Sequence, residues 1–106
     1  MKYIPVDKGK NLKYLGCSLQ QWKEYLESKF QPGMTWKNYG MYGWHVDEII
    51  PCSAWDLTKE EHEKACWHYL NSQPLWAKDN LAKSGANRKD YSKEVEEFLQ
   101  YLKSIS

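Results

Sequence analysis

Several features that would assign this chain to a particular class are missing from it. It has only three cysteines, Cys17, Cys52 and Cys66, and no Cys-x-x-Cys pair, which argues against a zinc ribbon and a disulfide framework. The first ten residues lack the apolar run of a signal peptide, and no segment approaches membrane-spanning length. A net charge of +1 excludes a polybasic nucleic-acid coat. We therefore expect no membrane association and a location in a reducing cytoplasm.

Large aromatic side chains, in contrast, are abundant. The chain contains six tryptophans and eight tyrosines among 106 residues. Such side chains bury much apolar area each, which a small core needs and a disordered chain lacks. The length suffices for one small domain and not for two, so we expect a single globular domain over residues 1–106.

Three helices are predicted from capping residues and apolar spacing. Ser18 and Gln21 form a capping box that begins a helix over about 18–30, whose apolar stripe is Leu19, Trp22, Leu26 and Phe30. Thr58 and Glu61 form a second capping box, which predicts a helix through about residue 69. A last amphipathic helix is expected over about 90–104, with apolar residues Tyr91, Val95, Phe98, Leu99 and Leu102.

Two short strands are expected between these helices. Residues 44–51 are rich in β-branched side chains and end at Pro51, and residues 74–77 form a second candidate. Asp79 can cap a helical turn that continues to about Lys83. Short strands among helices indicate an α+β fold.

A group of polar residues on these elements suggests a site. His45 and Asp47 lie two apart on one strand and point to the same face, whereas Asn71 precedes the second strand and Asn80 follows it. Carboxylate and amide oxygens suit Mg²⁺. The spacing alone is a weak signal, and by itself it favours a satisfied polar cluster beside a turn.

Longer blocks around these residues resemble the HNH endonucleases of phages and giant viruses. The blocks are GMTWKNYG at 33–40, WHVDEIIP at 44–51 and CWHYLNSQPLWAKDNLAK at 66–83. The family's usual first motif reads Trp-His-Ile-Asp-His-Ile-x-Pro, and the second ends in Asn-Leu-Gln-Pro-Leu-Trp-Ala-x-Asp-Asn-Leu. The resemblance covers about residues 15–87 and implies a ββα-metal core (the HNH, or His-Me finger, fold) over about 44–87, with flanking helices.

The resemblance also implies roles for individual residues. Asp47 and Asn80 fall on the metal-ligand positions, for one divalent cation of the Mg²⁺ or Mn²⁺ type. Asn71 falls on the position that pins the loop between the strands and orients the general base. The base itself is normally the histidine after the aspartate, and here that residue is Glu48.

Glutamate at the base position changes the expected chemistry. A carboxylate with a pKa of about 4.3 is a weaker base than histidine, and its charge opposes an anionic phosphate. Losing a general base typically costs about 10²- to 10⁴-fold in rate. Glu48 could instead join the metal shell, and His45 could substitute as base, although strand geometry places it beside Asp47.

A basic cluster follows the second strand. Lys83, Arg88 and Lys89 are candidate phosphate contacts, with Lys78 and Lys93 nearby, although such runs are often only a solvated face.

We therefore expect a DNA-binding viral protein in the host cytoplasm, whose metal-dependent hydrolase activity is weakened or lost through Glu48. The alternative is a catalytically retired nuclease fold that acts as an inhibitor or decoy against a host or defence protein. The aromatic content favours this alternative. A third interpretation makes Glu48 a variant of an otherwise active enzyme.

Overall fold

The computed structural model describes residues 13–85 and 89–105. Within them two antiparallel strands, β1 (Trp44–Glu48) and β2 (Ser72–Trp76), pair with Trp44 opposite Trp76. The α-helices are α1 (Leu19–Ser28), α2 (Glu60–Cys66), α3 (Ala77–Gly85) and α4 (Ser92–Ile105). Short 3₁₀ turns lie at 36–38, 52–54 and 69–71. The predicted α+β class is confirmed.

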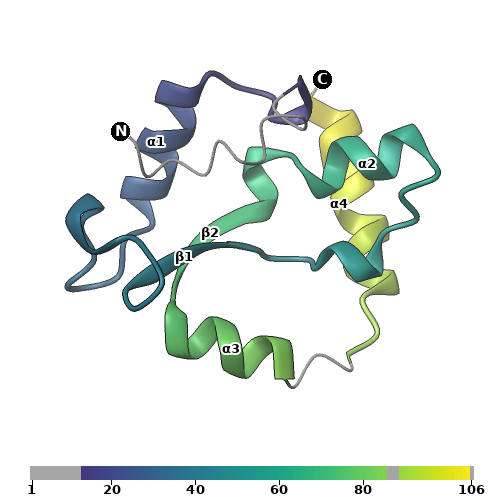
Figure 1. Cartoon of the computed structure of the whole chain (residues 1–106). Coiled ribbons are helices and arrows are strands. Elements are labelled where there is room, and N and C mark those ends of the chain that lie inside the picture. The colour runs from purple at the N-terminus through teal and green to yellow at the C-terminus, as the bar shows by residue number, and fades with distance from the viewer. Residues whose placement is uncertain (1–12, 86–88, 106) are drawn as a thin grey trace.

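The helices surround the strand pair from three directions. Figure 1 shows the strands at the centre, α1 and α3 on opposite sides of them, and α2 beside α4 beyond one end. One core cluster lies between α2 and α4, built from Ile50, Trp55, Ala65, Cys66 and Val95. A second joins α1 to the strands, built from Leu15, Trp22 and Leu26 with Val46 packed against them.

Helix α1 begins as its capping box predicts. Ser18 Oγ accepts from Gln21 N at 3.0 Å, and Gln21 Oε1 accepts from Ser18 N at 2.9 Å. Trp22 is buried and donates through Nε1 to Ser72 Oγ at 2.9 Å, which ties α1 to β2. The predicted stripe is wrong at its first member, because Leu19 is 40% exposed.

The second predicted capping box is wrong. Thr58 donates through both its backbone N–H and its hydroxyl to Asp56 Oδ1, at 3.2 and 2.6 Å. This local turn competes with capping, as short polar side chains commonly do. Helix α2 therefore begins later, at Glu60, without a side-chain cap on Lys59, and ends at Cys66 rather than near residue 69.

The strands are displaced slightly from their predicted bounds. Strand β1 ends at Glu48, before the predicted Pro51, and β2 begins at Ser72, before the predicted Pro74. Helix α3 follows β2 directly at Ala77, two residues before the predicted cap Asp79. The order strand, strand, helix brings α3 against both strands.

Gly43 directly precedes β1, at a position where the backbone admits no side chain. A Cβ on Gly43 would lie 1.5 Å from the backbone oxygen of Asn38, so only glycine fits where the preceding loop folds back. The carbonyl of Gly43 then accepts from Ala77 N at 2.7 Å, and this bond holds the first residue of α3 beside the start of β1.

Candidate functional site

One face of β1 is turned toward α3. His45 and Asp47 alternate with Val46, which packs against the α1 cluster on the other side. Asp47 is nearly buried, and its Oδ2 accepts from Gln73 Nε2 at 2.9 Å across the strand pair. The prediction that His45 and Asp47 lie on one face of the strand is confirmed, since both contact side chains of α3.

Lys83 reaches from α3 to the same carboxylate. Its Nζ donates to Asp47 Oδ2 at 2.7 Å, to the backbone oxygen of Glu48 at 2.7 Å and to that of Ile49 at 3.1 Å. An ammonium carries three N–H groups, so these oxygens match its full donor capacity. The predicted phosphate contact of Lys83 stays a prediction, but in this conformation its cation faces the strand. Sequence reasoning missed this ion pair.

The predicted metal ligands line one pocket of about 270 Å³. Its walls are Val46, Asp47, Glu48, Pro51, Cys52, Asn80 and Lys83. The donor set is mainly oxygen, from two carboxylates and an amide, which is the chemistry that Mg²⁺ and Mn²⁺ accept. In the part of the chain that the structure describes, no three His, Cys, Asp or Glu side chains converge on one metal position. The predicted ligand pair is thus Asp47 and the amide of Asn80, and metal binding by this pair stays a prediction.

Asn80 is held by the histidine of β1. Asn80 Nδ2 and His45 Nδ1 lie 2.9 Å apart, and the amide donates when His45 carries its proton on Nε2. With Nδ2 turned to the ring, the amide oxygen is oriented elsewhere. His45 thus positions Asn80, a role that spacing alone did not indicate.

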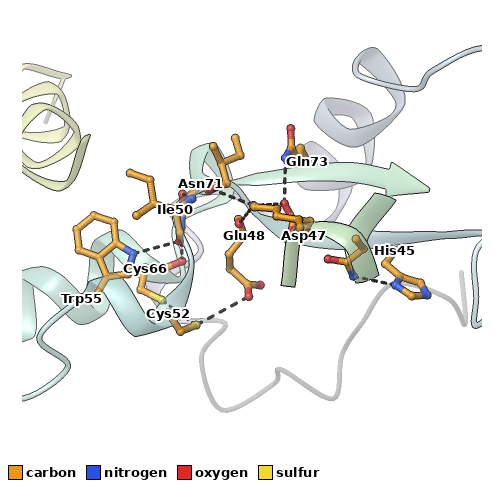
Figure 2. A network of polar contacts seen from close by, with 12 residues as sticks. His45, Asp47, Glu48, Ile50, Cys52, Trp55, Cys66, Asn71 and Gln73 are labelled. Carbon is orange, nitrogen blue, oxygen red and sulfur yellow. Dashed lines mark hydrogen bonds and ion pairs between the residues drawn. The ribbon is translucent and has the colours of Figure 1, made fainter. Parts of the chain in front are cut away.

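Glu48 is directed away from His45. Figure 2 shows its side chain turned toward Cys52, whereas His45 lies at the far end of the strand. Cys52 Sγ lies 3.8 Å from Glu48 Oε1, and Cys66 Sγ lies 3.2 Å from Cys52 Sγ. His45 is therefore poorly placed to replace Glu48 as base.

Asn71 connects the segment after β1 to the segment before β2. It is 2% exposed, and its Oδ1 accepts from Ile50 N at 2.8 Å. Its Nδ2 donates to Ile50 O at 3.0 Å and to Cys66 O at 3.1 Å (Figure 2). Through these bonds Asn71 fixes the backbone that follows Glu48.

Of the other basic candidates, Lys89 is described and Arg88 lies outside the described residues. Lys89 Nζ lies 2.7 Å from Glu94 Oε2 and 5.0 Å from the ring centroid of Tyr91. The hydrogen bond with Glu94 raises the pKa of Lys89, and the same bond lowers the pKa of Glu94. Lys89 is exposed and Glu94 is only partly covered, so water and salt screen the pair.

In residues 13–85 and 89–105, no helix combines the length and apolar character that crossing a membrane requires.

Comparison with known proteins finds relatives in one virus. The chain is 34% identical over 98 residues to uncharacterized protein L426 of Acanthamoeba polyphaga mimivirus, covering 92% of this chain and 43% of that protein. It is also 34% identical over 93 residues to uncharacterized protein L246 of the same virus, covering 84% of this chain and 41% of that protein. The chain thus spans about two fifths of the length of these relatives. No family model and no solved structure matches.

Proposed function

We propose that this chain is an HNH-like, ββα-metal domain that binds DNA and whose divalent-metal-dependent phosphodiester cleavage is weakened or lost through Glu48. The observation that carries the proposal is the pocket between β1 and α3, which Asp47, Glu48 and Asn80 line together. Similarity to two mimivirus proteins supports a viral origin. Action in the cytoplasm of an infected cell is part of the same proposal.

Asp47 and Asn80 would hold the cation in this proposal. A bound Mg²⁺ or Mn²⁺ would supply Lewis-acid stabilisation of charge on the phosphate. Asp47 is already oriented by Gln73, and Asn80 by His45, so both side chains are positioned by partners on the strands. Such supporting contacts normally fix the direction of metal ligands.

Glu48 lines the same pocket and stands next to Asp47 in the chain. As a base it would have to take a proton from water with a carboxylate of low intrinsic basicity. As an anion it would repel the phosphodiester that approaches the pocket. Both effects oppose cleavage. Binding of DNA through the basic residues of 83–89 does not need a general base, so it can persist when cleavage is lost.

The test is a plasmid-nicking assay with Mg²⁺ and with Mn²⁺, comparing the native chain with Glu48→His and Glu48→Gln. We expect Glu48→His to nick at least about 10²-fold faster than the native chain, because it restores a base near neutral pKa. Glu48→Gln removes the negative charge without adding a base, so it separates relief of repulsion from proton transfer. The double variant Asp47→Ala, Glu48→His controls for contaminating nuclease.

A second candidate function is binding of a host or defence protein. It is favoured by a hydrophobic tip beside β1, where Met41 is 75% and Tyr42 is 94% exposed. If Glu48→His remains inert while folded and metal-bound, and the native chain fails to shift duplex DNA at low salt, this second function replaces the first. Low salt is the stringent condition, since phosphate contacts are strongest there.

A further inference from the structure

We propose that the ammonium of Lys83 is a built-in cation that competes with the divalent ion for Asp47, so that metal binding requires Lys83 to leave the pocket. The inference rests on the proposed metal-dependent function and extends it to how the site is controlled. It begins from the contacts of Lys83 Nζ with the Asp47 carboxylate and the backbone oxygens of Glu48 and Ile49.

Three oxygens around one cation differ from an ordinary surface ion pair. The Lys83 and Asp47 side chains are only 25% and 10% exposed, whereas those of Lys89 and Glu94 are 59% and 35% exposed. Among residues 13–85 and 89–105, Lys89 Nζ meets one carboxylate oxygen, whereas Lys83 Nζ also meets two backbone carbonyl oxygens. Partial burial reduces screening, so the cation of Lys83 interacts strongly with its surroundings.

The two cations cannot share this position. Mg²⁺ binds carboxylate oxygen at about 2.0–2.1 Å, and Lys83 Nζ already lies 2.7 Å from Asp47 Oδ2. Both on one carboxylate would bring like charges within a few ångströms, where repulsion is large in a partly buried site. Lys83 and Asn80 also line the same pocket, so the ammonium lies where the predicted ligands converge.

Displacement has a consequence for nucleic acid. Lys83 released from Asp47 would stand at the mouth of the pocket with an uncompensated positive charge, available to a phosphate. Metal and phosphate would then favour each other's binding, because coupling between two ligands is reciprocal.

The test is calorimetric titration of Mn²⁺ into the native chain, Lys83→Met and Lys78→Met. Lys78 is an exposed residue of α3, so its substitution removes the same charge without touching Asp47. We expect Lys83→Met to bind Mn²⁺ at least about tenfold more tightly than the native chain, or about 1.4 kcal/mol. Lys78→Met should remain within a factor of about two, because exposed charges are screened.

Lys83→Gln serves if Lys83→Met does not fold, since its amide can still donate to a backbone carbonyl while its charge is gone. Equal Mn²⁺ affinity in the native chain and both Lys83 variants would overturn the competition and leave the proposed function standing. Binding by the variants alone would support the competition and mean that Lys83 has replaced the metal in the native chain. No binding by any of them would overturn both.

Discussion

Replacing Asn71 by alanine is the sharpest test of how the segment beside Glu48 is held. The amide makes three hydrogen bonds in a buried position, with the N–H and C=O of Ile50 and the C=O of Cys66. Alanine removes all three and fills less space. Ile50 O retains a bond from Trp55 Nε1 at 3.3 Å, so the largest losses fall on Ile50 N and Cys66 O.

The magnitude follows from these losses. A buried polar group that loses its partner costs about 1–3 kcal/mol, so two such groups give about 2–6 kcal/mol. A small domain has about 5–15 kcal/mol of stability in total. Asn71→Ala should therefore lower the urea midpoint severely, or prevent folding at 37 °C.

Asn38 provides a matched control. It also bonds through both ends of its amide, to Thr35 N at 2.8 Å and Gly33 O at 2.9 Å, but it is exposed. Water can replace those bonds, so Asn38→Ala should cost about 0.5–1.5 kcal/mol. If urea unfolding shows equal losses for the two variants, burial does not set the value of the Asn71 bonds and the reasoning is wrong.

Asn71→Asp separates acceptor from donor. The carboxylate can still accept from Ile50 N, but an ionised group faces two carbonyl oxygens, so its pKa in the folded state should rise above that of the unfolded chain. A raised pKa means that stability is retained at acid pH and lost as pH rises above about 4. The deficit relative to the native chain should therefore be smaller at pH 4 than at pH 7.

Three further predictions concern stability and binding. Burial lowers the pKa of His68, and His68 Nδ1 accepts from Leu70 N. The free energy of unfolding should therefore fall as pH drops below about 6.5, the pKa in the unfolded chain, and level off once pH is below the lowered pKa of the folded state. The slope is at most about 1.4 kcal/mol per pH unit. Urea midpoints at pH 7 and pH 5 should show this fall in the native chain and not in His68→Gln. Gly16→Ala should destabilise the fold more than Gly40→Ala. Both glycines have positive φ, but of the two only Gly16 would bring a Cβ against a side chain, 2.5 Å from His68 Nε2. Equal urea midpoints for the two variants would show that this clash does not affect stability. Lys89→Ala should leave the urea midpoint unchanged, because its ion pair is screened by solvent. In gel shifts it should reduce the slope of log affinity against log salt concentration by about 0.9. An unchanged slope would exclude Lys89 from the DNA contacts.

Local signals predicted the elements whose caps and apolar periods agree. The capping box at Ser18 and the apolar face around Val95 each required only a few neighbouring residues, and both are confirmed. The capping box at Thr58 failed because Asp56 offered the same residue a competing local bond. A sequence pattern does not say which of two short-range bonds is the more stable.

The site was predictable where it depends on strand period and not where it depends on tertiary contact. Alternation alone placed His45 and Asp47 on one face. The Lys83 ion pair joins residues 36 positions apart, and its other two acceptors are backbone oxygens, which have no signature in the sequence. A lysine in a basic run therefore suggested a phosphate contact, although its cation is directed inward here.

Glu48 and Lys83 have opposite effects on the charge of the pocket, and this gives a prediction that links them. The pocket holds two carboxylates and one ammonium, so one negative charge is in excess. Glu48→His removes that excess while it adds a base, so the variant should cleave faster yet require more metal. Adding Lys83→Met restores the negative charge. It should lower the Mn²⁺ concentration for half-maximal nicking by at least about tenfold relative to Glu48→His alone, which corresponds to about 1.4 kcal/mol.

Nicking measured across a Mn²⁺ series checks this, with Lys78→Met added to Glu48→His as the charge control. A metal requirement that is identical in all three proteins would show that the Lys83 cation does not act on the metal at all. A fall produced equally by Lys78→Met would show that the net charge of α3 matters, and not the contact with Asp47. Only a fall specific to Lys83 ties metal affinity to the three oxygens that surround its ammonium, because in the described part of the chain Lys83, and not Lys78, contacts those oxygens.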